Sequence, residues 1–277
     1  MSLGLRWASL GIALAFGVFL LLFEVLPGLL LVRVFWSEGH FSLASWGEAT
    51  KPLYLRALRN SFELAFFSAL QGAILGTLTA WALWSSPNPF VKRFTTGLSA
   101  VAANFAGPPL AFAFIVLLGG NGFFNLILKG LGLPPVDIYG KEGLYWVYLY
   151  FQWPLMTVLM LPAFGAIQRE WLEAARSLGS STWGFWWRVG LPVLLPSILG
   201  SFVLLFANAF GAYATVYALT QGQRNLLPLQ IGFQVGGDIG YNPVLASTLA
   251  LMMALVLAVS LVIYRLSRRW AARMEQV

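Results

Sequence analysis

Residues 168–192, QREWLEAARSLGSSTWGFWWRVGLP, form a charged and Trp-rich segment between two stretches that carry no charge. The stretch before it is Gly143–Ile167, and the stretch after it is about Pro196–Leu219. A helix of about 20 apolar residues crosses the ~30 Å hydrocarbon layer of a bilayer. The pattern therefore predicts two membrane-spanning helices joined by a polar loop, and it provides a template for finding further spans.

Four other stretches have similar length and apolar character, so we predict six transmembrane helices. The predicted spans are Trp7–Val32, Leu64–Trp84, Gly97–Leu118, Gly143–Ile167, Pro196–Leu219 and Pro243–Tyr264. The first is longer than the ~7–15-residue core of a signal peptide and lacks a small-residue cleavage site, so we expect it to be retained. The expected fold class is all-α: a polytopic membrane protein with six transmembrane helices and a cytoplasmic helix between spans four and five.

Composition supports this fold class and excludes several kinds of function. Of the 277 residues, 59% are hydrophobic and only 10% are charged, whereas a soluble domain is roughly 25% charged. This balance excludes a cytosolic enzyme, a nucleic-acid-binding module and a disordered chain. The chain has no cysteine and a single histidine, His40, which excludes disulfides, thiolate ligands and multi-histidine metal clusters. We expect no catalytic residue, metal or cofactor in this chain.

The distribution of basic residues predicts the orientation in the membrane. Ten of the 17 lysines and arginines fall at the N-terminus, at the C-terminus and in the loops on the same side as residues 168–192, and seven fall on the opposite side. Because cytoplasmic loops are enriched in lysine and arginine, this moderate bias places both termini in the cytoplasm.

Three parts of the chain are expected: an N-terminal span and outer loop (1–60), a core of five spans (61–265) and a cytoplasmic tail (266–277). None of the outer loops is long enough for a folded domain. The apolar run Phe123–Leu128 favours either a short interfacial helix or an ordered loop that caps the bundle.

Several residues within the predicted spans suggest specific contacts. Gly107-Pro108-Pro109 should break the third span, because proline lacks the backbone donor of a helix. Gly72 and Gly76 permit close helix approach. Glu24 lies within the first predicted span, where snorkelling or pairing with Arg33 would satisfy it and a direct substrate role is the alternative. Glu63 can pair with Arg59, four residues earlier.

The loop quoted above has its own local structure. Residues 169–178 are good helix formers, and Leu172, Ala175 and Leu178 recur at every third position as one apolar stripe. Glu173 and Arg176 lie off this stripe and can interact across one turn. Gly179 suits a helix C-cap, and a second short helical stretch follows. Such an amphipathic helix fits the groove of a partner protein.

This loop resembles the EAA loop of binding-protein-dependent ABC importer permeases. Glu173-Ala174-Ala175 is followed after three residues by Gly179, and after nine more by Val189-Gly190-Leu191-Pro192. The family pattern has the same spacing, with isoleucine in place of Val189. Residues 210–215 and 225–231 look most like the branch that carries polyamines, sulfate, molybdate and ferric iron.

The resemblance implies a permease subunit in the bacterial plasma (inner) membrane, which moves a small solute delivered by an external solute-binding protein. It implies a second permease subunit, with a heterodimer favoured over a homodimer, and an ATP-binding cassette ATPase dimer that binds ATP and Mg²⁺. The chain has no G-x-x-x-x-G-K-[ST] motif of its own. The implied ATPase-coupling residues are Leu172, Glu173, Ala174, Ala175, Arg176, Leu178, Gly179, Leu191 and Pro192.

A second group consists of polar residues within the predicted spans, which are candidates for the translocation path. These are Asn104, Gln152, Asn208, Tyr213 and Thr215. Hydrogen bonding between helices is the alternative role for each. Some members of the branch have acids near the position of Asn208, so its amide disfavours a polyamine substrate.

Two other functions were weighed. An ion-coupled secondary transporter would have paired intramembrane acids and an inverted repeat, and the sequence shows neither. A membrane-embedded enzyme would require clustered histidine, aspartate or glutamate, which the spans lack.

Overall fold

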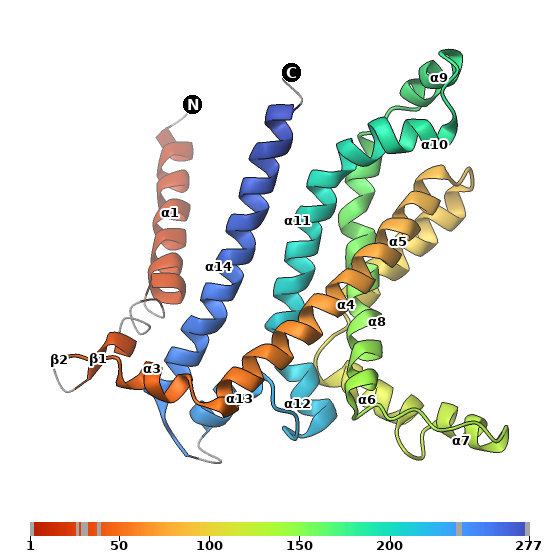
Figure 1. The fold of residues 1–277 in the computed structure, drawn as a ribbon. Helices are drawn as coiled ribbons and strands as arrows, with labels where there is room; N and C mark the ends of the chain where they lie inside the picture. Colours follow the sequence, from red (N-terminus) through yellow and green to blue (C-terminus); the bar gives the residue numbers. More distant parts are fainter. Residues whose placement is uncertain (1–2, 26–27, 29–32, 38–39, 237–239, 275–277) are drawn as a thin grey trace.

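The computed structural model describes residues 3–25, 28, 33–37, 40–236 and 240–274, and these fold almost entirely as helices (Figure 1). The only β-structure in this part of the chain is an antiparallel hairpin, in which Trp36–Ser37 (β1) pairs with His40–Phe41 (β2). The long helices slant side by side from the lower to the upper edge of Figure 1. The expected all-helical membrane architecture is confirmed at this level.

Five helical stretches are long and apolar enough to cross a bilayer. They are Pro52–Ser85 (α4), Pro108–Gly130, Lys141–Gly165 (α8), Thr182–Phe210 and Pro243–Leu266. Pro108–Gly130 contains two helices separated by a turn, α6 (Pro108–Leu118) and α7 (Phe123–Gly130). Thr182–Phe210 contains α10 (Thr182–Phe185), a π-helical turn (Trp186–Gly190) and α11 (Leu191–Phe210). These stretches overlap predicted spans two to six, but two of the predicted bounds are wrong. The stretch Pro108–Gly130 shares only residues 108–118 with predicted span three, Gly97–Leu118. Predicted span five, Pro196–Leu219, is broken after Phe210, because α11 ends there and a separate helix begins at Ala214.

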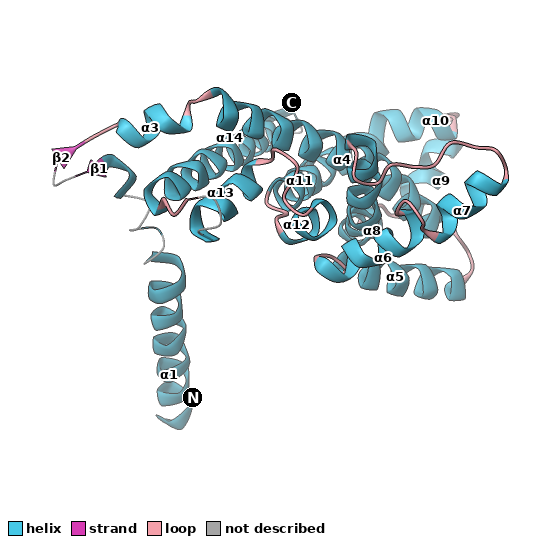
Figure 2. Ribbon diagram, turned by 90° about the horizontal axis from the view of Figure 1, so that it is seen from below, coloured by secondary structure: helices cyan, strands magenta, loops and turns pink. Residues whose placement is uncertain are grey.

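The first predicted span, Trp7–Val32, falls partly outside the described residues. Its described part contains α1 (Leu3–Leu20) and a π-helical turn (Leu21–Val25). The apolar helical portion Gly11–Phe23 is exposed throughout, and α1 stands apart from the other helices (Figures 1 and 2). Residues 26–27 and 29–32 and the side chains of Glu24 and Arg33 lie outside the described part, so a sixth span and the Glu24–Arg33 pair stay predictions.

The closest packing in the bundle joins α4 to α8. Their backbones approach at two glycines of α4: a Cβ added at Gly72 would lie 2.7 Å from Cβ of Gln152, and one added at Gly76 would overlap Met156. Small residues at a helix interface allow such approach and maximise dispersion contacts. The predicted packing role of these glycines is therefore confirmed.

The predicted third span is broken as expected. Helix α5 (Pro89–Asn104) begins at Asn88, whose side chain accepts hydrogen bonds from the backbone N–H of the next turn. It ends before residues 105–107, and α6 restarts at Pro108. Gly107 has φ +76°, a conformation that glycine adopts without steric cost. Its N–H donates to Thr215 Oγ1 at 2.8 Å, which replaces a bond of the helical ladder.

The bundle has two distinct ends. The lower edge of Figure 1 carries α3 (Ala44–Ala49), α7, α12 (Ala214–Thr220) and α13 (Leu227–Gly236), and we call it the α13 end. The upper edge carries the start of α1, α9 (Arg169–Ser177), α10 and the last turns of α14 (Pro243–Met274), and we call it the α9 end. Both ends of the chain thus lie on the same side of the bundle as the 168–192 loop.

Three helices differ from, or refine, the expected secondary structure. The alternatives left open at residues 123–128 are resolved in favour of a helix, α7. Helix α13 was not expected, because its ten residues are too short for a span. Helix α14 continues to Met274, so residues 266–274, expected to form a tail, extend the last helix.

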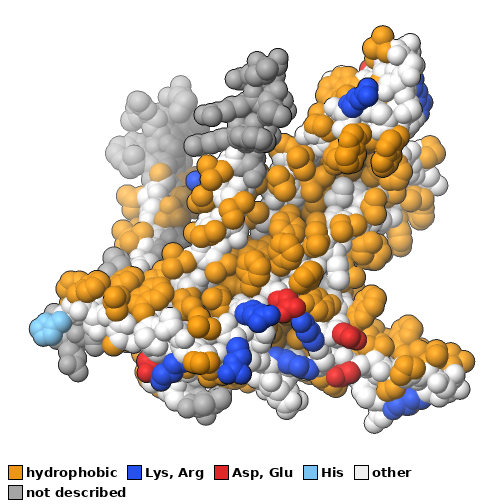
Figure 3. Space-filling model, in the orientation of Figure 1, with side chains coloured by type: hydrophobic (Ala, Val, Ile, Leu, Met, Phe, Trp, Pro, Cys, Tyr) orange, Lys and Arg blue, Asp and Glu red, His pale blue; other side chains and the backbone are white. Residues whose placement is uncertain are grey.

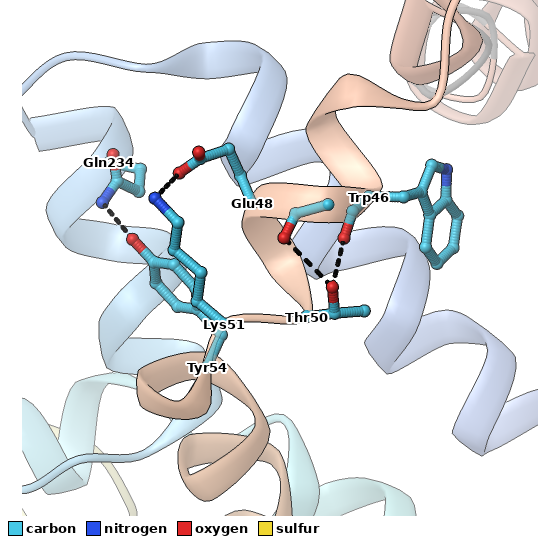
Figure 4. Close-up of polar contacts among 7 residues, drawn as sticks. Trp46, Glu48, Thr50, Lys51, Tyr54 and Gln234 are labelled. Carbon is cyan, nitrogen blue, oxygen red and sulfur yellow. Dashed lines mark hydrogen bonds and ion pairs between the residues drawn. The ribbon is translucent and has the colours of Figure 1, made fainter.

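The corner between α3 and α4 is fixed by polar contacts (Figure 4). Lys51 Nζ lies 2.6 Å from Glu48 Oε2, an exposed pair one helical turn apart. One turn into α4, the Tyr54 hydroxyl accepts a hydrogen bond of 3.4 Å from Gln234 Nε2 on α13. Helix α13 is thereby held against the start of α4.

Candidate functional site: the 168–192 loop and the polar residues of the spans

The predicted helix of the 168–192 loop is α9. It follows Gln168, which has an extended conformation, and ends at Leu178. Gly179 then has φ +80°, and the N–H of Ser180 donates to the carbonyl of Ala175 at 2.9 Å. A left-handed glycine that closes the last turn in this way is a Schellman-type cap, so the predicted cap at Gly179 is confirmed.

A second short helix follows directly. Ser181 begins it, and its Oγ accepts a hydrogen bond of 3.0 Å from the N–H of Gly184, as an N-cap serine does. Helix α10 continues through the π-helical turn into α11, whose first residues are the exposed Leu191 and Pro192. We call the segment of α9 and α10 (169–185) the α9–α10 hairpin; it lies at the upper edge of Figure 1.

The apolar stripe of α9 is only partly buried. Leu172 and Ala175 pack against the core, but Leu178 is 87% exposed. Leu178, the third residue of the expected stripe, is therefore not buried. The chain turns at Gly179, directly after it, and Leu178 does not pack against the bundle.

Glu170, Glu173 and Arg176 of α9 are exposed, and Glu173 and Arg176 do not pair with each other. Arg176 Nη2 donates to Thr182 Oγ1 on α10 at 3.3 Å. Among the described side chains, Glu173 makes no ion pair. Glu173 and Ala174 are therefore accessible on the outward face of the hairpin, together with the end of α9.

Trp186 attaches the hairpin to the bundle. Its ring lies 5.7 Å from that of Trp84, 6.4 Å from Trp81 and 6.3 Å from Phe164, all measured between ring centroids. Trp84 and Trp81 belong to α4, and Phe164 belongs to α8. Sequence reasoning did not single out Trp186, since the twelve tryptophans of the chain look alike without their packing partners. By contrast, Trp183 is 75% exposed and stacks only on Trp187 among the described rings.

Two of the candidate path residues contact each other between α8 and α11. Gln152 is fully buried, and its Nε2 donates to the carbonyl of Leu205 at 2.8 Å. Asn208 Nδ2 donates to Gln152 Oε1 at 3.4 Å, while Asn208 itself is exposed. The pair thus joins a satisfied buried amide to an accessible one.

The other three candidates lie near the helix break. Thr215 is buried and accepts the N–H of Gly107. Asn104 is exposed and donates to the carbonyl of Ala100, one turn earlier in α5. Tyr213 is partly exposed and stacks on Tyr217 with ring centroids 5.4 Å apart. The structure does not bring all five candidates together.

Ionic contacts at the α13 end were missed or misassigned from the sequence. Glu63 does not pair with Arg59 as expected; its Oε1 lies 2.6 Å from Lys141 Nζ at the start of α8. The closer partner is 78 residues away in the chain, so spacing along one helix could not reveal it. Among the described residues, no group of three histidine, cysteine, aspartate or glutamate side chains lies close enough to hold a metal.

Comparison with known proteins identifies the family. Residues 72–273 match the family described as binding-protein-dependent transport system inner membrane component. The chain is 27% identical over 196 residues to a probable sulfate transport system permease protein cysT of Helicosporidium sp. subsp. Simulium jonesii, covering 69% of this chain and 70% of that protein. It is 25% identical over 219 residues to the spermidine/putrescine permease PotB of Salmonella typhimurium, covering 75% and 76%. Some other sulfate permease relatives align over a little less than two thirds of their own length.

A solved structure shares the fold. It is a bacterial alginate ABC transporter in complex with an alginate pentasaccharide-bound periplasmic protein, with a TM-score of 0.76, 18% identity and coverage of 96% of this chain and 95% of the matched one. The fold and the sequence relatives indicate the same family of proteins. The chain therefore belongs to the family of binding-protein-dependent transport system inner membrane components, and it is a permease subunit of an ABC importer.

Proposed function

We propose that the α9–α10 hairpin is the surface that a separate ATPase binds, so that ATP hydrolysis in the ATPase moves the helices of this permease. The observation that carries the proposal is its combination of a capped helix, an exposed polar face and an attachment through Trp186 to both α4 and α8. A partner that displaces the hairpin would act on two central helices at once. ATP and Mg²⁺ would be bound by the ATPase dimer, since this sequence has no phosphate-binding loop.

The proposed topology has six spans, with α1 as the first and both termini in the cytoplasm. It is supported by the position of the start of α1, the end of α14 and the hairpin at the same end of the bundle (Figure 1). It is also supported by the excess of basic residues on that side. The α13 end then faces outward, where a solute-binding protein would dock.

The proposed path runs beside the exposed amide of Asn208 and the broken helix at Gly107. Non-helical backbone at membrane depth is tolerated where it borders a cavity or other protein. Asn104, Tyr213, Thr215 and Gln152 either line this path or hold its walls. A second permease subunit, in a heterodimer or alternatively in a homodimer, would complete it.

The experiment that tests the proposal measures coupling in the assembled importer. The chain is co-purified with its ATPase and second permease, and ATP hydrolysis stimulated by the loaded binding protein is compared among variants. We expect Glu173→Ala and Gly179→Asp to lower the stimulated rate, because one removes an accessible charge and the other strains the φ +80° cap. Arg93→Ala removes an exposed charge of α5, outside both the hairpin and the α13 end, and should leave the rate unchanged. Normal coupling in both hairpin variants would refute the assignment.

A further inference from the structure

A small cavity with both charged and apolar side chains in its wall lies at the α13 end, between α4, the start of α8 and the turn before α13. Its volume is about 130 Å³. The polar residues that line it are Asn60, Glu63, Lys141, Arg224 and Asn225, and three leucines complete the wall. Figure 3 shows lysine, arginine and acidic side chains gathered along this edge, below a broad apolar surface.

The rim of the cavity is held by hydrogen bonds that do not use its cationic groups. Asn60 Nδ2 donates to the carbonyl of Asn225 at 3.0 Å, and Asn225 Nδ2 donates to the carbonyl of Leu53 at 3.0 Å. Gln230 Nε2 donates to Asn225 Oδ1 at 2.9 Å. The turn that carries Arg224 is thus fixed to α4 before any ligand enters, which lowers the cost of ordering a site.

Both cations of the cavity keep unused donors. Arg224 Nε donates to the carbonyl of Tyr139 at 2.8 Å, and Nη2 donates to the same oxygen. Arg224 Nη1 has no acceptor among the described residues. Lys141 Nζ has one partner, Glu63 Oε1, although an ammonium carries three donors.

The charge balance favours an anion in this cavity. Two cations face a single acid, and Arg59 lies one helical turn from Glu63 along α4. Arg224 also lines a second cavity of about 560 Å³, together with Thr220, Gln221 and Gln223. A cation approaching this region would meet Arg224 and Lys141, whereas an oxyanion would meet their free donors.

We propose that Lys141 and Arg224 form an oxyanion site at the outer mouth of this permease, which takes the carboxylate or sulfate-like group of an anionic solute. The assignment of this end as the outer mouth rests on the proposed function. The site itself is a property of the isolated chain, because all of its residues come from one subunit.

Glu63 competes with the ligand for Lys141. Its carboxylate holds the ammonium at 2.6 Å, so an incoming anion must displace it or share the lysine with it. Replacing Glu63 by the neutral Gln should therefore strengthen anion binding, while replacing either cation should weaken it. General damage to the fold would weaken anion binding in both variants. It would not produce stronger binding at Glu63 and weaker binding at its contact partner Lys141.

The test uses the full chain reconstituted in lipid nanodiscs, with sodium sulfate, sodium acetate and spermidine as probes at constant ionic strength. Binding is measured by isothermal titration. Sulfate should bind to the wild-type chain more tightly than spermidine, with acetate reporting whether a carboxylate suffices. Lys141→Gln and Arg224→Gln should each weaken sulfate binding by about tenfold, as expected for loss of one charge-assisted contact, and Glu63→Gln should strengthen it. Arg56→Gln, which removes an exposed cation of α4 outside the cavity, should have no effect.

Three outcomes would overturn the oxyanion site: tighter binding of spermidine than of sulfate, unchanged sulfate binding in both cation variants, or equal loss in Arg56→Gln. None of them depends on an ATPase. If sulfate binding fails while the hairpin variants still uncouple ATP hydrolysis, this inference falls and the proposed function stands. The reverse result would leave the oxyanion site in place and remove the role of the hairpin.

Discussion

At the α13 end, side-chain hydrogen bonds and ion pairs connect residues that are far apart in the chain, whereas in the α9–α10 hairpin the side-chain hydrogen bonds connect near neighbours. Glu63 pairs with Lys141, Asn60 donates to Asn225 and Ser61 accepts from Leu227, across 78 to 166 positions. In the α9–α10 hairpin, the described side-chain hydrogen bonds span no more than six positions. One end is locked by tertiary polar contacts, and the other folds locally.

The difference bears on which end can move. Polar contacts with defined geometry between distant elements resist rearrangement, while a locally capped helix keeps its shape when it is displaced. The hairpin is fastened to the bundle by apolar contacts, namely the rings around Trp186 and the packing of Leu172, Ala175 and Phe185, and such packing has weaker directional demands than a hydrogen bond. We expect this construction in a segment that a partner protein displaces as a unit while the α13 end keeps its structure.

The largest expected effect comes from the α4–α8 pair, which connects the two ends. In Gly76→Leu the new side chain would collide with Met156 and with the backbone of α8, so we expect a loss of about 3 kcal/mol or more in stability. Unfolding in mixed micelles, followed by tryptophan fluorescence, measures it. Gly97→Leu is the control, because a Cβ there meets nothing within 4 Å. Equal effects would show that the two helices do not approach as described.

Loss of the Trp186 anchor should detach the hairpin without disturbing the α13 end. For Trp186→Ala we expect about 2 kcal/mol of destabilisation, below the range for a fully buried tryptophan because this side chain is half-buried. Amide hydrogen exchange should increase in residues 168–190 and stay unchanged in 221–236. Trp183→Ala, at a 75% exposed position, should change neither. Faster exchange at both ends of the bundle would contradict the separation of the two regions.

Asn225 provides the corresponding test at the α13 end. Asn225→Ala removes the bond to the carbonyl of Leu53 and the acceptor of Gln230, so we expect a loss of about 1–2 kcal/mol. Hydrogen exchange should increase in 221–236 and in the first turns of α4, and the hairpin should keep its protection. Asn121→Ala, at an exposed turn position, serves as the control. Faster hydrogen exchange in the hairpin alone would contradict the conclusion that Asn225 stabilises the α13 end.

A smaller effect is expected in the middle of the bundle. Gln152→Leu removes the donor to Leu205 and the acceptor of Asn208. Hydrogen bonds between transmembrane helices contribute little on average, so we expect about 1 kcal/mol. The same micelle unfolding assay measures it, with Asn104→Leu as the comparison because Asn104 bonds only within its own helix among the described contacts. A loss of several kcal/mol would mean that Gln152 supports more than this pair.

The smallest effect is expected at the exposed Lys51–Glu48 pair. Both side chains are more than half exposed, and such pairs contribute about 0–1 kcal/mol. Lys51→Ala should therefore change stability by less than about 0.5 kcal/mol in the micelle assay, at low and high salt alike. A larger, salt-sensitive loss would show that the α13 end depends on surface charge rather than on its long-range hydrogen bonds.

Local chemistry made much of the fold predictable. The break at Gly107-Pro108, the helix of the 168–192 loop and the cap at Gly179 all depend on residues within a few positions of each other. At Phe123–Leu128 the sequence left a helix and an ordered loop as alternatives, and the structure has the helix. The long helices α4, α8 and α14 follow from length and hydrophobicity alone, but the interruption of predicted span five after Phe210 does not.

Tertiary contacts decided what the sequence could not reveal. Arg59 is the nearer partner of Glu63 in the chain, but Lys141 is the nearer one in space. Trp186 differs from the other tryptophans only through its position between α4 and α8. Leu178 continues an apolar stripe in the sequence, yet it is exposed because the chain turns at Gly179. Each depends on how separate helices meet.

The central claim, that the α9–α10 hairpin contacts the ATPase, can be tested directly because the chain has no native cysteine. Glu173→Cys and Glu142→Cys are each labelled with benzophenone maleimide in the assembled importer and irradiated. The account predicts a cross-link from position 173 to the ATPase subunit and none from position 142. Absence of the cross-link at 173, or its equal formation from 142, would contradict it.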